Sequence, residues 1–218
     1  MVESTLARKA AVVLGGSSPY GAATARMLAR EGANLVLGGR SRGRLEALGE
    51  EVRASGVQAV VVGVHLAKRH HPAHLMEAAV EAFGSLDVLL FMARSTAPPL
   101  RTLEVEAWER SVDVNVKGLL YSVAAALPIM REGGGGHVIC LDAEDPGPPD
   151  PLYRAGQAAQ CAILRELARE LSDWGIRTTG VRLGDTRRMG PDRCAEAVRR
   201  VLLDPPGTDA GFSIQEVS

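Results

Sequence analysis

A tyrosine, a glutamine and a group of acids stand close together in one stretch of the chain, where they could take part in proton transfer. Tyr153 precedes Gln157 by one turn of a predicted helix. A phenol can donate a proton to a carbonyl, but with an ordinary pKa near ~10 it is a poor base at neutral pH without a neighbouring cation. Paired carboxylates are a second means of general acid–base catalysis. The alternative interpretation is that the acids of this proline-rich loop are simply solvated. The loop before Tyr153 contains Asp142, Glu144, Asp145 and Asp150.

A second candidate site is the glycine-rich stretch VVLGGSSPYGAATARML near the start of the chain. Gly15, Gly16 and Gly21 stand between a predicted strand and a predicted helix, where small residues let the backbone approach a pyrophosphate at the helix N-terminus. The alternative is a tight turn that needs glycine for its backbone alone. In the first interpretation, the cofactor-binding residues of this turn are Gly15, Ser17, Ser18, Tyr20 and Gly21.

The next predicted strand ends in LGGRSRGRLEAL, which bears on the choice of nucleotide. Arg40 stands where a site for NAD would offer a carboxylate to the ribose hydroxyls. A guanidinium suits a 2′-phosphate instead, so the sequence favours NADP(H). Arg42 and Arg44 lie nearby, and a solvated Arg40 among several arginines is the alternative.

A histidine cluster in KRHHPAHL resembles a metal site only superficially. Pro72 indicates a helix start, so we expect His70 and His71 to precede the helix and His74 to lie in its first turn. The stretch lacks a carboxylate or cysteine partner at ligand spacing, so we interpret it as a surface cluster and predict no metal site. The cysteines are three in number and far apart in sequence, which favours reduced thiols over a disulfide framework.

Short apolar runs alternate along the chain with longer amphipathic segments. The apolar runs predict strands covered on both faces, and the amphipathic segments predict helices. Together they predict a single α/β domain over residues 1–218, a Rossmann-type doubly wound parallel sheet of about seven strands with helices on both faces. Its ligand crevice lies at the carboxyl ends of the strands. The predicted strands are 10–14, 34–38, 58–64, 86–92, 137–141, 176–182 and 211–217.

Composition excludes several classes of function. The 218 residues are 46% hydrophobic with a formal net charge of −1, as expected for a soluble domain. This balance gives no basic field for nucleic acid. No apolar run approaches the ~18 residues that cross a bilayer, so we expect no membrane association. The first residues do not resemble a signal peptide, so we expect a cytoplasmic protein.

The motifs together resemble the short-chain dehydrogenase/reductase family over nearly the whole chain. The resemblance implies a cofactor site at the first turn and a catalytic set of asparagine, serine, tyrosine and lysine, the last two in a YxxxK pattern. It also implies a homodimer or homotetramer that packs through the long fourth and fifth helices. The stretches that carry it are GGSSPYG, LAREGANLVLGGRSRGRLEAL, AFGSLDVLLFMA, VNVKGLLYSVAAALPIM and YRAGQAAQCAILRELARELSDWGIRTTGVRLGDT.

On the cofactor side, the match to the family is partial. The middle glycine of the first turn is Pro19, which lacks a backbone N–H for the pyrophosphate. The family's aspartate at the adenine is His65, which Leu66 follows. The family's NNAG ends here in Ala93 and Arg94, so a long cation stands where a glycine would admit the cofactor. Pro19 and Arg94 therefore weaken the expected NADP(H) site, although Arg94 could also meet a phosphate or lie exposed.

The resemblance also implies cofactor contacts from His65, Leu66, Ala93 and Gly184, since Leu183-Gly184 stands where the family has Pro-Gly. The chain then runs almost directly from RLGDTRRMG into PDRCAEAVRRVLLD, whereas the family places a substrate-covering helical segment there. We therefore expect an open cleft that is poorly shielded from water.

On the catalytic side, two of the four roles are changed. Asn115 matches the family asparagine, which holds a helix bulge and a water chain, and Tyr153 matches the acid–base tyrosine. The serine position is Ala143 and the lysine position is Gln157. Gln157 can keep a hydrogen bond to the nicotinamide ribose, but it cannot supply the charge that lowers the pKa of a tyrosine. A further hypothesis is that Asp142 or Glu144 replaces the lost serine.

Two functions follow. The first is an NADP(H)-linked reductase or dehydrogenase of low or altered activity, acting on a small-molecule or carrier-borne carbonyl substrate. The second is a non-redox relative: a cofactor-sensing or partner-binding protein, or an isomerase, cyclase or dehydratase that uses the open acidic cleft.

Overall fold

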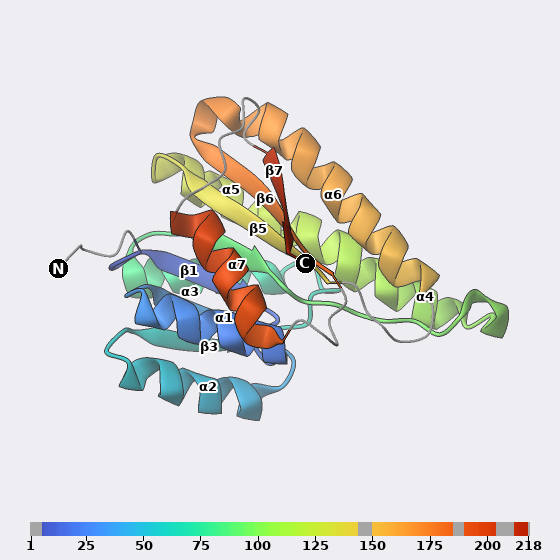
Figure 1. Ribbon diagram of the computed structural model, residues 1–218, viewed down its shortest axis with the longest axis horizontal. Coiled ribbons are helices and arrows are strands. Elements are labelled where there is room, and N and C mark those ends of the chain that lie inside the picture. The colour runs from blue at the N-terminus through green and yellow to red at the C-terminus, as the bar shows by residue number, and fades with distance from the viewer. Residues whose placement is uncertain (1–5, 144–149, 185–189, 204–211, 218) are drawn as a thin grey trace.

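The computed structural model describes residues 6–143, 150–184, 190–203 and 212–217, with Ala143 and the last of these ranges described by their backbone alone. Within these ranges the strands form one sheet of seven in the order β3-β2-β1-β4-β5-β6-β7, and every neighbouring pair is parallel. This confirms the predicted Rossmann-type parallel sheet (Figure 1). The strands are β1 Ala10–Leu14, β2 Asn34–Gly39, β3 Ala59–Gly63, β4 Val88–Phe91, β5 Gly136–Ala143, β6 Ile176–Leu183 and β7 Phe212–Val217.

Helices cover both faces of this sheet, because alternate side chains of each strand point in opposite directions. Ala11 and Val13 of β1 pack on one face with apolar residues of α1, α2 and α7. Val12 and Leu14 pack on the other face with residues of α3, α5 and α6. The helices are α1 Pro19–Arg30, α2 Arg42–Ala54, α3 His71–Phe83, α4 Val105–Val112, α5 Gly118–Glu132, α6 Pro151–Leu171 and α7 Pro191–Leu203.

The order of the strands places the crevice of the fold beside β1. This strand pairs with β2 on one side and with β4 on the other, so the chain turns toward opposite edges of the sheet after β1 and after β4. In open parallel sheets a crevice forms at the carboxyl ends of the strands where the order reverses. The turn after β1, the loop after β4 and the start of α6 therefore meet at the carboxyl ends of the strands.

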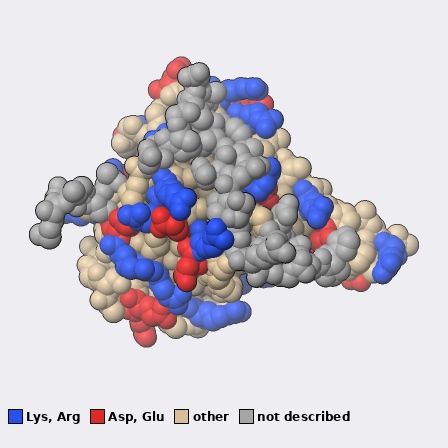
Figure 2. All heavy atoms as spheres, in the orientation of Figure 1, with Lys and Arg blue, Asp and Glu red and all other residues tan. Residues whose placement is uncertain are grey.

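Acidic and basic side chains intermingle over α1, α2 and α7 (Figure 2). Arg26 of α1 pairs with Glu51 of α2 at 2.6 Å, and Arg199 of α7 pairs with Glu31 at the end of α1 at 2.5 Å. These pairs link neighbouring helices across their exposed faces, in keeping with a net charge of −1.

The helical segment Val105–Glu132 departs from the expectation that no apolar run approaches the length of a membrane span. It comprises α4, the π-helical turn η2 (Asp113–Lys117) and α5, and by length and composition it is long and apolar enough to cross a membrane, with a mean hydropathy of 1.3 over its most apolar window. It contacts α3 through α5 and α6 through α4, and Leu119, Val123 and Met130 of α5 are buried in the core. These contacts are those of a packed helix of the fold.

Two boundaries bear on other expectations. Helix α3 begins at His71, so the prediction that His71 precedes the helix is wrong: Pro72 stands at the second position of the helix, where its missing N–H is equally harmless. The expected loss of the substrate-covering segment concerns the connection between β6 and α7, of which residues 185–189 lie outside the described residues.

Candidate active site

The turn after β1 is held by one serine and two glycines. Ser18 is the N-cap of α1: its Oγ accepts a hydrogen bond from the Gly21 N–H at 3.0 Å and donates one to the Gly15 carbonyl at 2.8 Å. Gly15 has a φ of +94°, and a Cβ there would lie 2.7 Å from the backbone of Met92 and Ala93. A Cβ on Gly21 would lie 2.3 Å from the Gly15 carbonyl oxygen. The turn thus brings β1, α1 and the end of β4 into backbone contact.

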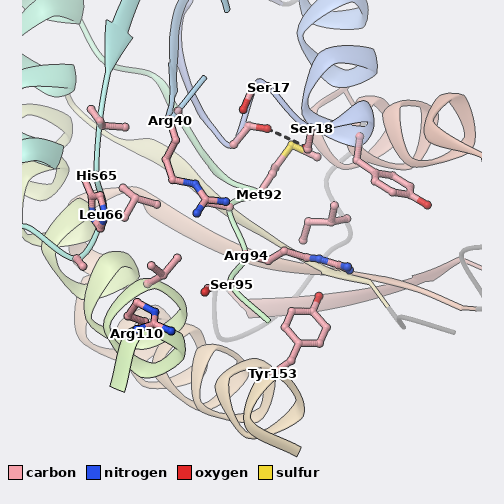
Figure 3. A pocket seen from close by; sticks show the side chains of 18 of the residues that line it. Ser17, Ser18, Arg40, His65, Leu66, Met92, Arg94, Ser95, Arg110 and Tyr153 are labelled. Atoms are coloured by element: carbon pink, nitrogen blue, oxygen red, sulfur yellow. Dashed lines mark hydrogen bonds between the residues drawn. The ribbon is translucent and has the colours of Figure 1, made fainter. Parts of the chain in front are cut away.

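This turn forms one wall of a cavity of about 390 Å³ at the carboxyl ends of the strands (Figure 3). The other walls come from the ends of β2 and β3, the loop after β4, α4 and the start of α6. The cavity is lined by Gly15, Ser17, Ser18, Pro19, Tyr20, Gly39, Arg40, Val64, His65, Leu66, Ala67, Met92, Ala93, Arg94, Ser95, Arg110, Val114, Leu141 and Tyr153.

Most of the predicted cofactor residues therefore lie around one cavity. The exceptions are Gly21 and Gly184, which are not among its lining residues. Gly21 instead lies buried under Gly15, which explains a requirement for glycine without ligand contact. The predicted residues that line the cavity are Gly15, Ser17, Ser18, Tyr20, Arg40, His65, Leu66 and Ala93.

The charge around this cavity is positive. Arg40, Arg94 and Arg110 line it, and its described lining includes no carboxylate. Arg40 follows the end of β2 and points toward the middle of the cavity (Figure 3). This arrangement fits an anionic ligand such as a nucleotide phosphate.

Asn115 lies in the π-helical turn η2, as its expected role at a helix bulge requires. Its side chain is 2% exposed and fully engaged. Its Oδ1 accepts from the Ser95 N–H at 2.8 Å, and its Nδ2 donates to the Ser95 carbonyl at 2.7 Å and to the Ser111 Oγ at 3.1 Å. Asn115 therefore fixes the loop after β4 against the bulge.

A residue missed by the sequence analysis completes this arrangement. Gln160 of α6 is buried, and its Nε2 donates to the Asn115 carbonyl at 2.7 Å. Gly156 makes the close approach possible, since a Cβ there would lie 2.9 Å from the Cβ of Asn115. Spacing offered a signal for Gln160, because it follows Tyr153 by about two helical turns and so shares its helix face. Its partner, however, is 45 residues away in sequence.

Tyr153 is buried at the start of α6, with 6% of its surface exposed. Asp150 caps this helix: its Oδ1 accepts from the Tyr153 N–H and its Oδ2 from the Ala97 N–H, both at 2.8 Å. The guanidinium carbon of Arg94 lies 5.1 Å from the centre of the Tyr153 ring. Figure 3 shows the two side chains on facing walls of the cavity, Arg94 from the loop after β4 and Tyr153 from α6.

Asp142 and Gln157 lie elsewhere. Both line a second, smaller pocket between α6, β5 and β6, together with Gln160 and Cys161. The Oδ2 of Asp142 accepts from the Nε of Arg182 at 3.0 Å, across neighbouring positions of β5 and β6. Neither residue is among the lining of the large cavity.

The remaining sequence candidates are placed as follows. Ala143 ends β5 and its backbone pairs with Leu183, whereas Glu144 and Asp145 lie outside the described residues. Gly184 directly follows β6. The roles predicted for the acids and for Gly184 stay predictions.

The three histidines at the start of α3 lie close together, and only the rings of His71 and His74 are stacked. The rings of His70, His71 and His74 have centroids within 6.2 Å of one another, and the His71 Nδ1 accepts from the His65 N–H at 3.1 Å. Burial and the neighbouring cations lower the pKa of His71. Within the described parts of the chain, no group of three histidine, cysteine or acidic side chains could hold a metal ion.

The described cysteines are unpaired thiols. Burial raises the pKa of Cys194 to about 12 and raises that of Cys140 further. The buried thiols of Cys140 and Cys194 are therefore protonated at neutral pH and act as small apolar side chains of the core.

Comparison with known proteins places these features in a family context. Residues 9–190 match the short chain dehydrogenase family. The chain is 37% identical over 213 residues to the glycine betaine reductase ATRR of Emericella nidulans, a match that covers 92% of this chain but 17% of that protein. It is 31% identical over 219 residues to an uncharacterized oxidoreductase of Staphylococcus aureus, a match that covers 93% of this chain and 94% of the relative.

Solved structures with the same fold include nucleotide complexes. A metagenomic short-chain oxidoreductase in complex with NADP superposes with a TM-score of 0.87 at 27% identity, over 99% of this chain and 100% of the other. An alcohol dehydrogenase from the archaeon Thermococcus sibiricus, complexed with 5-hydroxy-NADP, superposes with a TM-score of 0.83 at 26% identity, over 96% of this chain and 95% of the other.

Proposed function

Because the chain belongs to the short-chain dehydrogenase family, we propose that it is an NADP(H)-dependent oxidoreductase that reduces a carbonyl group with Tyr153 as proton donor. The observation that carries the proposal is the cavity of about 390 Å³, which has Arg40 on its wall and Tyr153 at its far end. The glycine-rich turn and the phenol are thus arranged around one space that a dinucleotide and a small substrate can share. The substrate class is a small-molecule or carrier-borne carbonyl compound.

The residues present fit NADP(H). Gly15 brings the turn so close to the backbone of Met92 and Ala93 that a side chain there would collide, which leaves the cavity wall smooth where a pyrophosphate would approach. Arg40 offers a guanidinium for the 2′-phosphate, and the described lining contains no carboxylate that would repel it. Bound NADPH would supply the hydride for the substrate carbonyl carbon.

The protein's own part in the reaction is to hold the carbonyl and supply a proton. The Tyr153 hydroxyl donates a hydrogen bond to the carbonyl oxygen, which stabilises the negative charge that develops there and then transfers the proton. Asn115 and Asp150 hold Tyr153 in place, since they fix the loop after β4 and the start of α6. A serine hydroxyl at position 143 and a lysine at position 157 are missing, so we expect slow turnover.

The first test of this proposal is nucleotide binding. We expect NADPH to bind more tightly than NADH in a calorimetric titration. Arg40→Ala should weaken NADPH binding about tenfold or more, as expected for one charge-assisted phosphate contact, and leave NADH binding nearly unchanged. Arg44→Ala is the matched control, because Arg44 bonds to Ser41 and does not line the cavity. Absence of binding by either nucleotide would contradict the proposal.

The second test is turnover. NADPH oxidation with a panel of aldehydes and ketones should be slow and should fall further in Tyr153→Phe. The double variant Ala143→Ser, Gln157→Lys should gain activity, since it restores the serine and the lysine of the family pattern.

A non-redox function is the second candidate, and the position of Gln157 favours it, because this residue is not among the lining of the large cavity. A protein that senses NADPH without oxidising it would bind the nucleotide with the same preference and show no Tyr153-dependent turnover on any carbonyl compound.

We also propose that the protein is a homodimer or homotetramer. Exposed apolar side chains on α4 and α5 support this, among them Val105, Val112 and Leu120, each more than 40% exposed. Light scattering would reveal the assembly, and Leu120→Glu should reduce its size if these helices form the interface.

A further inference from the structure

Arg94 is the most unusual residue of the cavity, because the family pattern has glycine at this position. It follows β4, whose last residue Phe91 pairs with Leu14 of β1 and Cys140 of β5. From there the Arg94 side chain reaches toward α6, where its guanidinium lies over the Tyr153 ring at 5.1 Å from the centroid. A cation at this distance from an aromatic ring is attracted by its π-electrons.

The backbone around Arg94 is fixed relative to Tyr153. The residue after Arg94, Ser95, is bound through both its N–H and its carbonyl by Asn115. Two residues further on, the Ala97 N–H donates to the same Asp150 carboxylate that accepts from the Tyr153 N–H. Arg94 and Tyr153 are therefore neighbours because two sets of hydrogen bonds join their segments, although Arg94 itself is exposed.

Three polar residues that the structure describes at α6 and β5 do not supply this cation. Gln157, one helical turn further along α6, is neutral. Asp150 is engaged with two backbone N–H groups, and Asp142 on β5 is paired with Arg182 of β6. Arg110 of α4 lines the same cavity but lies apart from Tyr153 in Figure 3.

We propose that Arg94 is a positioning residue that supplies, from the loop after β4, the positive charge beside Tyr153 that the neutral Gln157 does not supply. The guanidinium holds the ring by its face and favours the phenolate over the phenol. The inference rests on the proposed function, in which Tyr153 is the proton donor. The cation comes from a segment that precedes Tyr153 by 59 residues in the chain, since 153 − 94 = 59.

The direct test is the ionisation of Tyr153, which needs neither nucleotide nor turnover. The chain contains three tyrosines, Tyr20, Tyr121 and Tyr153. Replacing them with fluorotyrosine lowers their titration into a range where the fold persists, and ¹⁹F NMR follows each ring; Tyr153→Phe identifies the relevant signal. We expect Arg94→Met to raise the midpoint of Tyr153 by about 0.5 to 1 pH unit, at the low end of the range for a nearby charge because Arg94 is exposed.

Matched variants distinguish the effect of the Arg94 charge on the Tyr153 midpoint from the effect of altering the side chain. Arg94→Lys should keep most of the wild-type midpoint, and Arg110→Met should leave it unchanged, since Arg110 lines the cavity away from Tyr153. The shift in Arg94→Met should also shrink at high salt, which screens an exposed charge. An Arg94→Met midpoint equal to that of the wild type would overturn the proposal.

Kinetics supply the second arm. In Arg94→Met we expect kcat/KM for carbonyl reduction to fall about tenfold and the alkaline limb of its pH profile to move upward with the Tyr153 midpoint. Adding Gln157→Lys to Arg94→Met should restore both, because a lysine at this position returns the missing cation. If Arg94→Gly instead raises activity at an unchanged pH profile, Arg94 is an obstruction and the proposal is wrong. A wild type without turnover would contradict the proposed function but leave the NMR test of Arg94 intact.

Discussion

The two halves of the cavity differ in how far their residues keep to the family pattern. The nucleotide half, formed by β1 to β3 with α1, keeps its outer glycines, and its strongest constraints are local: Ser18, Gly15 and Gly21 lie within seven residues of one another. In the tyrosine half, formed by β4, α4, η2 and α6, two positions differ from the pattern that the family resemblance implies: Ala143, at the end of the neighbouring β5, stands at the predicted serine position, and Gln157 stands at the predicted lysine position. Its contacts join distant segments, such as Ser95 with Asn115 and Asn115 with Gln160. The contacts of the nucleotide half can therefore be predicted from a local sequence motif. Those of the tyrosine half can be found only from the way its helices pack in the folded chain.

The largest expected effect sharpens this contrast in the nucleotide half. Gly21→Ala should lower the free energy of unfolding by about 3 kcal/mol or more, because its Cβ would lie 2.3 Å from a backbone oxygen that α1 and β1 hold in place. Urea unfolding measures the loss. Gly43→Ala in α2 is the control: a Cβ there meets nothing within 4 Å, so we expect no loss of stability. A stable, nucleotide-binding Gly21→Ala would show that the turn is less constrained than its geometry indicates.

A smaller effect is expected in the tyrosine half. Gln160→Leu should lower the free energy of unfolding by about 1 to 3 kcal/mol, because it leaves the buried Asn115 carbonyl without the Gln160 donor. Tyr153-dependent turnover should fall as well, since the bulge around Asn115 loses its link to α6. The exposed substitution Glu170→Leu on the same helix serves as the control and should change stability by less than about 0.5 kcal/mol. If the two variants lower the free energy of unfolding equally, the hydrogen bond of Gln160 does not stabilise the tyrosine half.

The smallest expected effect lies at the opposite end of β5 from the cavity. His137 is 3% exposed; burial, with a contribution from Arg177, lowers its pKa to about 3. As pH falls below 6.5, the unfolded chain takes up a proton that the folded protein does not, so stability is present above that pH and declines toward pH 3. Between pH 6 and 5 this amounts to about 1 kcal/mol.

His137→Gln removes this titration and can keep a hydrogen bond to Thr179, whose Oγ1 lies 2.8 Å from the His137 Nε2. Urea unfolding of both proteins at several pH values should therefore give a stability difference that changes in favour of the variant as the solution becomes more acidic. Parallel pH curves for the two proteins would show that His137 gains its proton in the folded state as readily as in the unfolded chain.

The sequence predicted the fold well, because apolar runs covered on both faces have few other arrangements. All of the predicted strands are present, and most predicted cofactor residues line one cavity. Gly21, Gly184, Asp142 and Gln157 are not among its lining residues, and the roles predicted for them stay predictions. Pro72 predicted the start of α3 to within one residue, since proline fits several positions of a first helical turn.

The contacts that define the tyrosine half could not be predicted in the same way. Arg94 and Tyr153, Asp142 and Arg182, and Asn115 and Gln160 are each at least 40 residues apart. Each pair forms only because the sheet order and the π-helical turn bring the segments together. Ala143 and Gln157 predicted the loss of two catalytic roles, whereas the contacts of Arg94, Asp142 and Gln160 are seen only in the folded chain.

The hydrogen bond from Gln160 to the Asn115 carbonyl also has a consequence for motion. It joins the middle of α6 to the π-helical turn η2 within the Val105–Glu132 helix. Opening of η2 exposes the Asn115 carbonyl to solvent only if its hydrogen bond with the Gln160 carboxamide also breaks. The two segments should therefore unfold locally as one cooperative unit. In hydrogen-exchange measurements the amides around Gly118 and those of α6 near Leu164 should then share one opening free energy. The wall of the cavity behind Tyr153 is then the part that opens most slowly.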